Sequence, residues 1–289
     1  MPLDAASVGA TFETAPKRVE LASALAFAAG LGAMEGAFLD DHTSSPFPCL
    51  PFYCVSLEWQ AVLGLRRVTA SMLTPDEAAR AVHAGQSSRF LLPIVAGMLV
   101  VTQARLAAAR LARPGTICTY QIDTRCAHTG ELLTATRSTT IFRDVALSGD
   151  VAPVPDPAAN GAPWTLGEGW TEIGIPIARS APHVYSACAN IWNPIHTERA
   201  VALAAGLPDI ILHGTATWAL AGLEIVRERL GGDASRLRGL SGDFAGMVIP
   251  GAPLRLRLGK PDASRLPFEV RGPSGDVVLR KGVAFVEAS

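Results

Sequence analysis

The sequence has no excess of charge of either sign, since 25 Lys and Arg residues stand against 26 Asp and Glu residues in 289. A protein that binds the phosphate lattice of a nucleic acid needs a basic surface, so no nucleic-acid partner is expected. Charged residues make up only 18% of the chain and hydrophobic residues 49%. This composition excludes a disordered or coiled-coil protein and favours a globular protein that binds small molecules.

Several motifs for cofactors and nucleophiles are also absent. The sequence has no GxxxxGK loop, no GxGxxG fingerprint and no GxSxG turn, so nothing predicts a nucleotide cofactor or serine hydrolysis. Its five cysteines form no CxxC pair, which argues against a zinc site and against a disulfide framework. We therefore expect no cofactor and no metal, and a reducing, cytoplasmic location.

Two apolar stretches fall short of a membrane segment. Residues 24–34 and 91–101 are both shorter than the roughly 20 apolar residues that a spanning helix needs. Glu13 and Glu20 lie where a signal peptide would be basic. We therefore expect no membrane partner.

The clearest shift in composition divides the chain almost in half. Residues 151–163 hold four prolines, which predict a linker because proline continues neither a helix nor an inner strand. The predicted domains are residues 1–150 and 164–289.

Each half offers a long apolar helix followed by antiparallel strands. In the first half, residues 19–34 read as an Ala-rich helix, and Thr74-Pro-Asp-Glu77 has the pattern of a capping box. Residues 116–123 and 132–143 alternate as strands, joined by a hairpin turn at 127–130. This order predicts an α+β fold in which a sheet wraps a helix.

The second half follows the same order. Helices are predicted at 197–206 and at 215–230, the latter ended by Gly231-Gly232. Predicted strands cover 171–177, 254–258, 268–271 and 277–286.

The segment that carries chemistry is Asn193-Pro-Ile-His196, followed by His213-Gly214 at the start of an apolar helix. This pattern resembles the MaoC-like, (R)-specific enoyl-thioester hydratase family. Phe244-Ala-Gly-Met-Val-Ile-Pro-Gly251 and Pro48-Cys-Leu-Pro-Phe52 are similar to other landmarks of its two-domain members. The resemblance implies a double hot-dog fold, two modules that each wrap a long central helix in an antiparallel β-sheet. It also implies that the amino-terminal module is non-catalytic and shapes the pocket.

Hydrating a 2-enoyl thioester requires that a proton is transferred at the α-carbon and that a water molecule is positioned over the β-carbon. It also requires that charge on the thioester oxygen is stabilised. Histidine trades protons near neutral pH, so His196 is the candidate acid or base. The backbone N–H groups of Gly214 and Thr215 lie at a predicted helix N-terminus, where they can donate to that oxygen. Pro194 fixes the turn that aims His196.

Five further residues complete the candidate site as substrate-binding positions. We expect Asn193 to hold its loop by a hydrogen bond, His213 to hold the turn before the helix, and Asp209 to cap or lie in a loop. Tyr185 and Trp192 are expected to be pocket or core aromatics. The set is Asn193, Tyr185, Trp192, Asp209 and His213.

One position departs from the family pattern. Five residues before the histidine, where the family has a catalytic aspartate, this sequence has Ile191. Losing one positioned acid or base typically costs about 10²–10⁴-fold in rate. The site recruits another group, runs a different reaction with His196 alone, or binds without chemistry. The nearby candidates for a replacement are Asn190, Asp209, Tyr185 and His183.

In the first half, His83 and Gln86 are predicted to lie on a surface helix or loop rather than in a pocket.

The function that the resemblance implies is a hydro-lyase, a hydratase or dehydratase acting on a 2-enoyl or 3-hydroxyacyl thioester of coenzyme A or a carrier protein. The alternatives are a dehydrating or addition-type cyclase on the same scaffold and a non-catalytic acyl-thioester-binding protein. A homodimer is expected from the resemblance alone.

Overall fold

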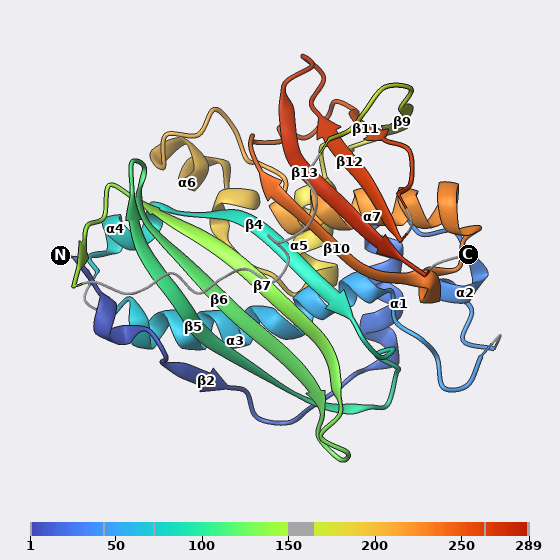
Figure 1. The fold of residues 1–289 in the computed structure, drawn as a ribbon, viewed down its shortest axis with the longest axis horizontal. Helices are drawn as coiled ribbons and strands as arrows, with labels where there is room; N and C mark the ends of the chain where they lie inside the picture. Colours follow the sequence, from blue (N-terminus) through green and yellow to red (C-terminus); the bar gives the residue numbers. More distant parts are fainter. Residues whose placement is uncertain (1, 43, 72, 150–164, 263, 288–289) are drawn as a thin grey trace.

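A long, curved antiparallel sheet organises the molecule in the computed structural model (Figure 1), which describes residues 2–42, 44–71, 73–149, 165–262 and 264–287. Its strand order is β2-β5-β6-β7-β4-β10-β13-β12-β11-β9, with β3 paired to β5. The predicted linker, residues 151–163, lies outside the described residues.

The strands, in chain order, are β1 (Leu3–Asp4), β2 (Thr11–Glu13), β3 (Lys17–Arg18), β4 (Ala81–Phe90), β5 (Leu99–Ala112), β6 (Gly115–Cys126), β7 (Leu132–Arg143), β8 (Leu147–Ser148), β9 (Thr171–Ile175), β10 (Leu237–Phe244), β11 (Leu254–Leu258), β12 (Arg265–Arg271) and β13 (Val277–Val286). The α-helices are α1 (Leu21–Gly30), α2 (Gly36–Leu39), α3 (Cys54–Thr69), α4 (Pro75–Ala79), α5 (Ala181–Ala189), α6 (Arg199–Ala204) and α7 (Gly214–Leu230). The described residues also form short 3₁₀ turns at η1 (Ala5–Ser7), η2 (Pro51–Tyr53), η3 (Pro194–His196) and η4 (Ala234–Arg236).

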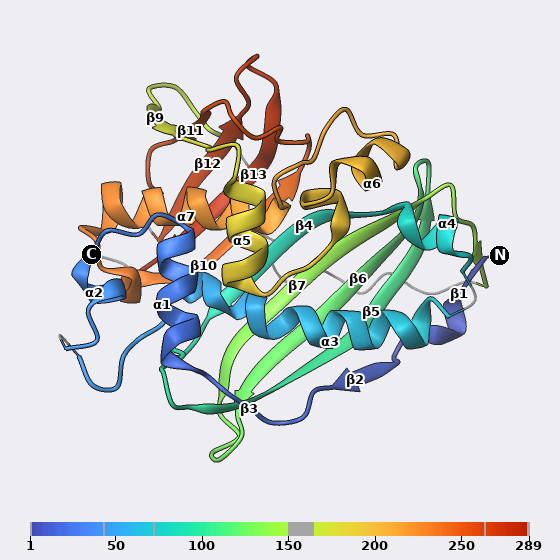
Figure 2. The ribbon, with the colours of Figure 1, turned by 180° about the vertical axis from the view of Figure 1, so that it is seen from behind.

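The central helix of the first module is α3, which crosses the inner face of β5 and β6 (Figure 2). The prediction that residues 19–34 provide the long helix of this half is wrong in that respect. Those residues form the shorter α1, which packs against α5. The core side of α3 carries an apolar residue at every fourth position. These residues, Leu57, Ala61 and Leu65, are at most 4% exposed. The carboxyl group of Glu58 breaks this apolar pattern, so the sequence alone did not identify the helix.

The central helix of the second module is α7, as residues 215–230 predict. It ends at Leu230 and is capped by Gly231, which takes the left-handed conformation that favours glycine at this position. At Gly222 the helix passes so close to Phe52 that a Cβ atom would lie 2.4 Å from its ring. The two modules therefore contact each other between α7 and η2 as well as between strands.

Several local predictions are confirmed. Thr74 and Glu77 form a reciprocal capping box at the start of α4. Strands β6 and β7 pair antiparallel through the expected hairpin. The predicted helix at 197–206 is shorter, and α5 and β10 have no counterpart in the predicted elements.

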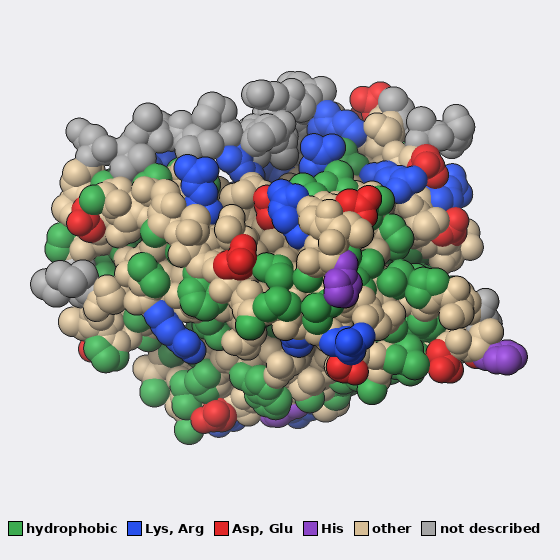
Figure 3. All heavy atoms as spheres, turned by 90° about the horizontal axis from the view of Figure 1, so that it is seen from below, with side chains coloured by type: hydrophobic (Ala, Val, Ile, Leu, Met, Phe, Trp, Pro, Cys, Tyr) green, Lys and Arg blue, Asp and Glu red, His purple; other side chains and the backbone are tan. Residues whose placement is uncertain are grey.

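The modules join where β4 pairs antiparallel with β10, so that Gln86 lies opposite Gly242 and Gly85 opposite Asp243. The acidic and basic side chains are interspersed on the face drawn in Figure 3. Among the described residues, no helix is both long enough and apolar enough to cross a membrane.

Candidate active site

His196 ends the short turn η3, and its ring is held by one backbone hydrogen bond. Asn193 caps the turn and Pro194 occupies its first position, as expected for a rigid loop. The Nδ1 atom of His196 lies 2.7 Å from the carbonyl oxygen of Ile211. Because a carbonyl only accepts, Nδ1 carries the proton and Nε2 keeps its lone pair. The structure therefore gives His196 the tautomer of a base.

His213 stacks on this ring. The centroids of the two imidazoles are 3.7 Å apart with an interplanar angle of 24°. The Nε2 atom of His213 contacts the Ile191 carbonyl oxygen at 3.3 Å and Ser186 Oγ at 3.1 Å. His213 is 2% exposed and is the N-cap residue of α7, which fits the expected role of holding this turn.

Gly214 and Thr215 are the first two residues of α7. The first backbone hydrogen bonds of the helix run from Ala216 and Thr217 to the His213 carbonyl oxygen. The N–H groups of residues 214 and 215 precede these bonds, so they are the donors that a helix start leaves for a ligand. A Cβ atom at Gly214 would lie 3.2 Å from the ring of Phe244, so glycine keeps the approach to this helix start open.

Burial keeps both imidazoles neutral. It lowers the pKa of His196 to about 4, and the bond to the Ile211 carbonyl only partly opposes that shift. Burial, reinforced by the charge of His196, lowers the pKa of His213 to about 2. At neutral pH the site thus offers an uncharged acceptor, His196 Nε2, beside a helix N-terminus.

Tyr185 lies on the other side of His213, with ring centroids 4.9 Å apart. It is 2% exposed, and its hydroxyl has no hydrogen-bond partner among the described residues. Burial raises the pKa of this hydroxyl, an effect that the neighbouring Thr215 side chain opposes. Tyr185 therefore stays protonated and can donate a hydrogen bond to a ligand.

The side chain of Ile191 is 5% exposed within the hydrophobic core, while its carbonyl oxygen accepts from His213. No carboxylate takes its place among the neighbours named from sequence. Asp209 pairs with Arg199 at 3.1 Å, and His183 lies 3.0 Å from the Thr197 carbonyl oxygen. Asn190 accepts from Trp192, which is 57% exposed and so is not the pocket or core aromatic expected.

The structure thus brings His196, His213, Gly214, Thr215 and Tyr185 together, with Asn193 as a cap, and leaves Trp192 and Asp209 outside the group. Sequence analysis missed Ser186, because a serine inside a helix carries no signal of its own. It also misplaced His83 and Gln86, which lie on strand β4 and not on a surface helix or loop. The ring of His83 stands against Phe244 with centroids 4.8 Å apart.

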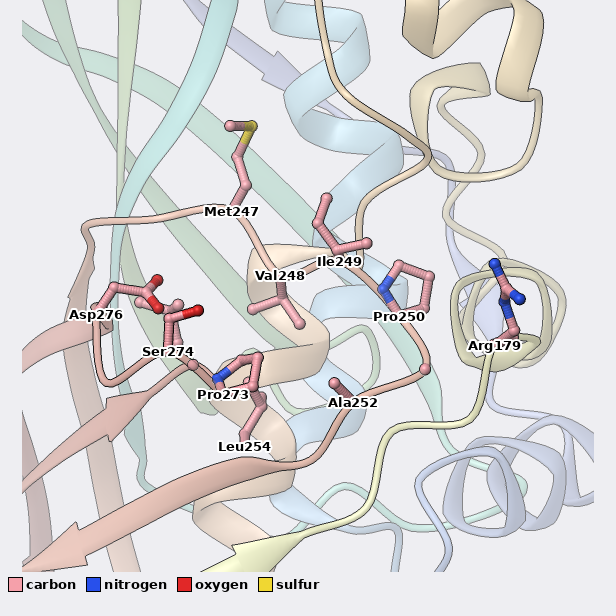
Figure 4. A pocket seen from close by; sticks show the side chains of 13 residues that line it. Arg179, Met247, Val248, Ile249, Pro250, Ala252, Leu254, Pro273, Ser274 and Asp276 are labelled. Carbon is pink, nitrogen blue, oxygen red and sulfur yellow. The ribbon is translucent and has the colours of Figure 1, made fainter.

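Two pockets lie near these elements, and neither is lined by His196 or Gly214. The first, of about 440 Å³, lies between Arg179 and the loops 247–252 and 272–276 (Figure 4). It adjoins the site because Val248, one of its lining residues, accepts from the N–H of Leu212 at 2.8 Å. The second, of about 410 Å³, is mostly apolar and lies at the carboxyl-terminal end of α7. The described residues contain no cluster of three or more His, Cys, Asp or Glu that could hold a metal ion.

Comparison with known proteins finds a domain match within the second module. Residues 170–271 match the MaoC like domain. Over 118 residues the chain is 35% identical to enoyl-CoA hydratase ChsH3 of Mycobacterium tuberculosis, a match that covers 40% of this chain and 41% of that protein. Over 86 residues it is 35% identical to 3-hydroxyacyl-thioester dehydratase Y of the same organism, covering 29% and 30%. The matches span less than half the length of these relatives.

Solved structures align with nearly the whole chain. A MaoC-like dehydratase from Phytophthora capsici superposes with a TM-score of 0.81 at 18% identity, covering 99% of this chain and 98% of that one. A Mycobacterium tuberculosis protein described as having a double hot-dog fold superposes with a TM-score of 0.64 at 16% identity, covering 96% and 95%. The protein therefore has a double hot-dog fold, and its residues 170–271 match the MaoC like domain.

Proposed function

We propose that the protein adds water to a 2-enoyl thioester, or removes it from the corresponding 3-hydroxyacyl thioester, with His196 as the only acid–base group that contacts the reacting atoms. The observation that carries this proposal is the His196–Ile211 hydrogen bond, which leaves Nε2 free beside the start of α7. The domain family and the names of the relatives, an enoyl-CoA hydratase and a hydroxyacyl-thioester dehydratase, support the same class of substrate.

In the hydration direction, Nε2 of His196 removes a proton from water while the water oxygen bonds to the β-carbon. The electron pair of the double bond moves toward the thioester oxygen, where the N–H groups of Gly214 and Thr215 stabilise the charge. The imidazolium then returns one proton to the α-carbon. One water has been added, and the base is again neutral.

The pocket beside Leu212 suits the carrier portion of such a thioester. It opens next to the His213 turn, and the guanidinium of Arg179 lies at one side of it (Figure 4). A guanidinium is well suited to phosphate groups, which both coenzyme A and a carrier-protein arm contain. We assign this pocket to that part of the substrate.

His196→Ala tests the proposal directly. With crotonyl-coenzyme A as probe, loss of the enoyl absorbance should slow by about 10²–10⁴-fold, the usual effect of removing a positioned acid–base group. His128→Ala, which removes an exposed histidine in the β6–β7 hairpin, is the matched control and should keep the wild-type rate. An unchanged rate in His196→Ala would show that this imidazole performs no chemistry.

A second function, a dehydrating or addition-type cyclase, is favoured by one observation: the position of the usual carboxylate is the buried apolar side chain of Ile191. Ile191→Asp separates the two functions. If only the carboxylate is missing from a hydration site, hydratase activity should rise about tenfold or more, while Ile191→Asn, which buries an uncharged group of the same shape, should not. If both variants fold and neither gains activity, the cyclase becomes the better assignment.

A further inference from the structure

The second pocket lies where the two modules meet, at the carboxyl-terminal end of α7. It has a volume of about 410 Å³ and is lined by residues of α2, by the segments before α3 and after β4, and by residues between 231 and 238. In Figure 2, α2 lies beside this end of α7. The helix has 17 residues and is therefore about 25 Å long, so the pocket is remote from the His196 site at the other end.

This pocket repeats the frame of the first pocket in the other module. Strands β4 and β10 follow the two central helices and pair with each other antiparallel. Each strand ends in a phenylalanine at the start of its own module's helix. Phe244 faces the start of α7, and the ring of Phe90 lies 6.1 Å from that of Phe52, just before α3. The loops that follow these strands, residues 247–252 and 91–94, line the first and the second pocket respectively. The two pockets therefore occupy equivalent places in the repeated module.

The second pocket has no counterpart of the catalytic imidazole. In the second module the residues before the central helix include His196 and His213. The residues before α3 that line the pocket are Pro48, Cys49 and Pro51, and there is no histidine among its described lining residues. Burial raises the pKa of the Cys49 thiol to about 12, so this thiol stays neutral. The pocket is therefore suited to binding and not to proton transfer.

The backbone of the pocket wall offers few hydrogen bonds to a ligand. Three of the lining residues are prolines, which have no N–H group. The N–H groups of Leu91 and Leu92 both donate to the Leu133 carbonyl oxygen, at 2.9 and 3.2 Å. The N–H group of Cys49 donates to the Ile94 carbonyl oxygen at 2.9 Å. A ligand in this pocket is therefore held chiefly by apolar contact.

The charged side chains of the pocket are exposed and already paired. Arg238 and Glu287, each about half exposed, form an ion pair at 2.7 Å. Asp233 accepts from the N–H group and the hydroxyl of Ser235. Because both signs of charge are present, they favour no net charge on the ligand. Of the lining side chains, only that of Thr134 has a buried polar atom without a partner among the described residues, so the pocket can satisfy one polar atom of a ligand.

We propose that the second pocket is a non-catalytic binding site for the aliphatic chain of an acyl compound, a chain with one oxygen function and no net charge. Its volume lies within the range of about 300–1,000 Å³ that is usual for small-molecule sites. The chain would cover Leu91 and Leu92, lining residues that are 38% and 41% exposed. The choice of an acyl chain rests on the proposed function, because the equivalent pocket adjoins a site assigned to an acyl thioester.

Isothermal titration with straight-chain alcohols from hexanol to nonanol tests this proposal, since each probe is an uncharged chain with one oxygen. Affinity should rise about fourfold with each added methylene group, and the heat-capacity change of binding should be negative. Leu92→Asp and Leu91→Asp each place a carboxylate in the apolar wall and should weaken octanol binding at least about tenfold. Leu111→Asp is the matched control, because Leu111 is 61% exposed on β5 and does not line the pocket.

The control variant should bind octanol as the wild type does, and all three variants should keep the wild-type rate with crotonyl-coenzyme A. Absence of saturable binding, affinity that ignores chain length, or octanol binding that is the same in Leu92→Asp and Leu111→Asp overturns the proposal. If octanol binds as expected but no enoyl thioester turns over, the pocket stands and the proposed function fails. If crotonyl-coenzyme A is hydrated but both lining variants bind octanol normally, this proposal alone fails.

Discussion

At the scale of single residues, the site depends on which ring nitrogen of His196 is free. The hydrogen bond to the Ile211 carbonyl oxygen places the proton on Nδ1, so no carboxylate is needed to fix the tautomer of His196. What a carboxylate at position 191 would add is a second acid–base group. Without it, burial leaves His196 with a pKa near 4 and a weak tendency to take a proton.

Gly214→Ala probes the helix start that faces this base. The added methyl would lie 3.2 Å from the ring of Phe244, so the ring must move and the approach to the N–H groups narrows. A misplacement on this scale costs up to about 10²-fold, and we expect kcat/KM to fall by about 10- to 100-fold with little change in the urea midpoint. Gly36→Ala, at the start of α2 with nothing within 4 Å, is the control. An unchanged kcat/KM in Gly214→Ala would remove this helix start from the mechanism.

At the scale of elements, sequence analysis succeeded where the signal was local. The capping box of Thr74, the β6–β7 hairpin and the glycine that ends α7 are each set by a few neighbouring residues. It failed for α3, because a buried Glu58 inside an apolar helix makes sense only with Thr136 and Gln86 in place. These partners come from strands far along the chain. The sequence also did not predict that His196 stacks on His213, although both residues belong to the predicted site.

Glu58 also makes the packing of α3 against β4 and β7 depend on pH. Its pKa is about 7 in the folded chain and near 4.5 when unfolded, so the folded state binds the extra proton between these values. The stabilisation is complete below about pH 4.5 and is lost as pH rises through 7, by up to about 3 kcal/mol. In urea unfolding, Glu58→Gln should therefore gain stability relative to the wild type between pH 5.5 and 8.5. A difference that does not vary with pH would mean that Glu58 is ionised throughout.

At the scale of the whole molecule, the two modules share one sheet through β4 and β10. They are also tied by Arg227 in the last turn of α7, whose guanidinium reaches Glu35, Glu224 and the Gly32 carbonyl oxygen. The hydrogen bond from Arg227 lowers the pKa of Glu35, as expected for a carboxylate beside a guanidinium. Glu35 lies just before α2 in the first module, and Arg227 lies in the second. The contact therefore joins residues 192 positions apart in the sequence. The molecule should unfold in one transition rather than module by module.

Arg227→Met tests that tie, since it keeps much of the side-chain volume and removes the charge. Glu35 and Glu224, 23% and 16% exposed, would lose their shared cation, so the free energy of unfolding should fall by about 1–2 kcal/mol. Arg238→Met is the control, because Arg238 and its partner Glu287 are about half exposed and should contribute less than about 0.5 kcal/mol. Urea titrations of both variants, followed by tryptophan fluorescence and by circular dichroism, measure these losses. Two separated transitions in Arg227→Met would show that this contact makes unfolding cooperative. Equal losses in the two variants would show that the partly buried Arg227–Glu35 pair contributes no more than a surface pair.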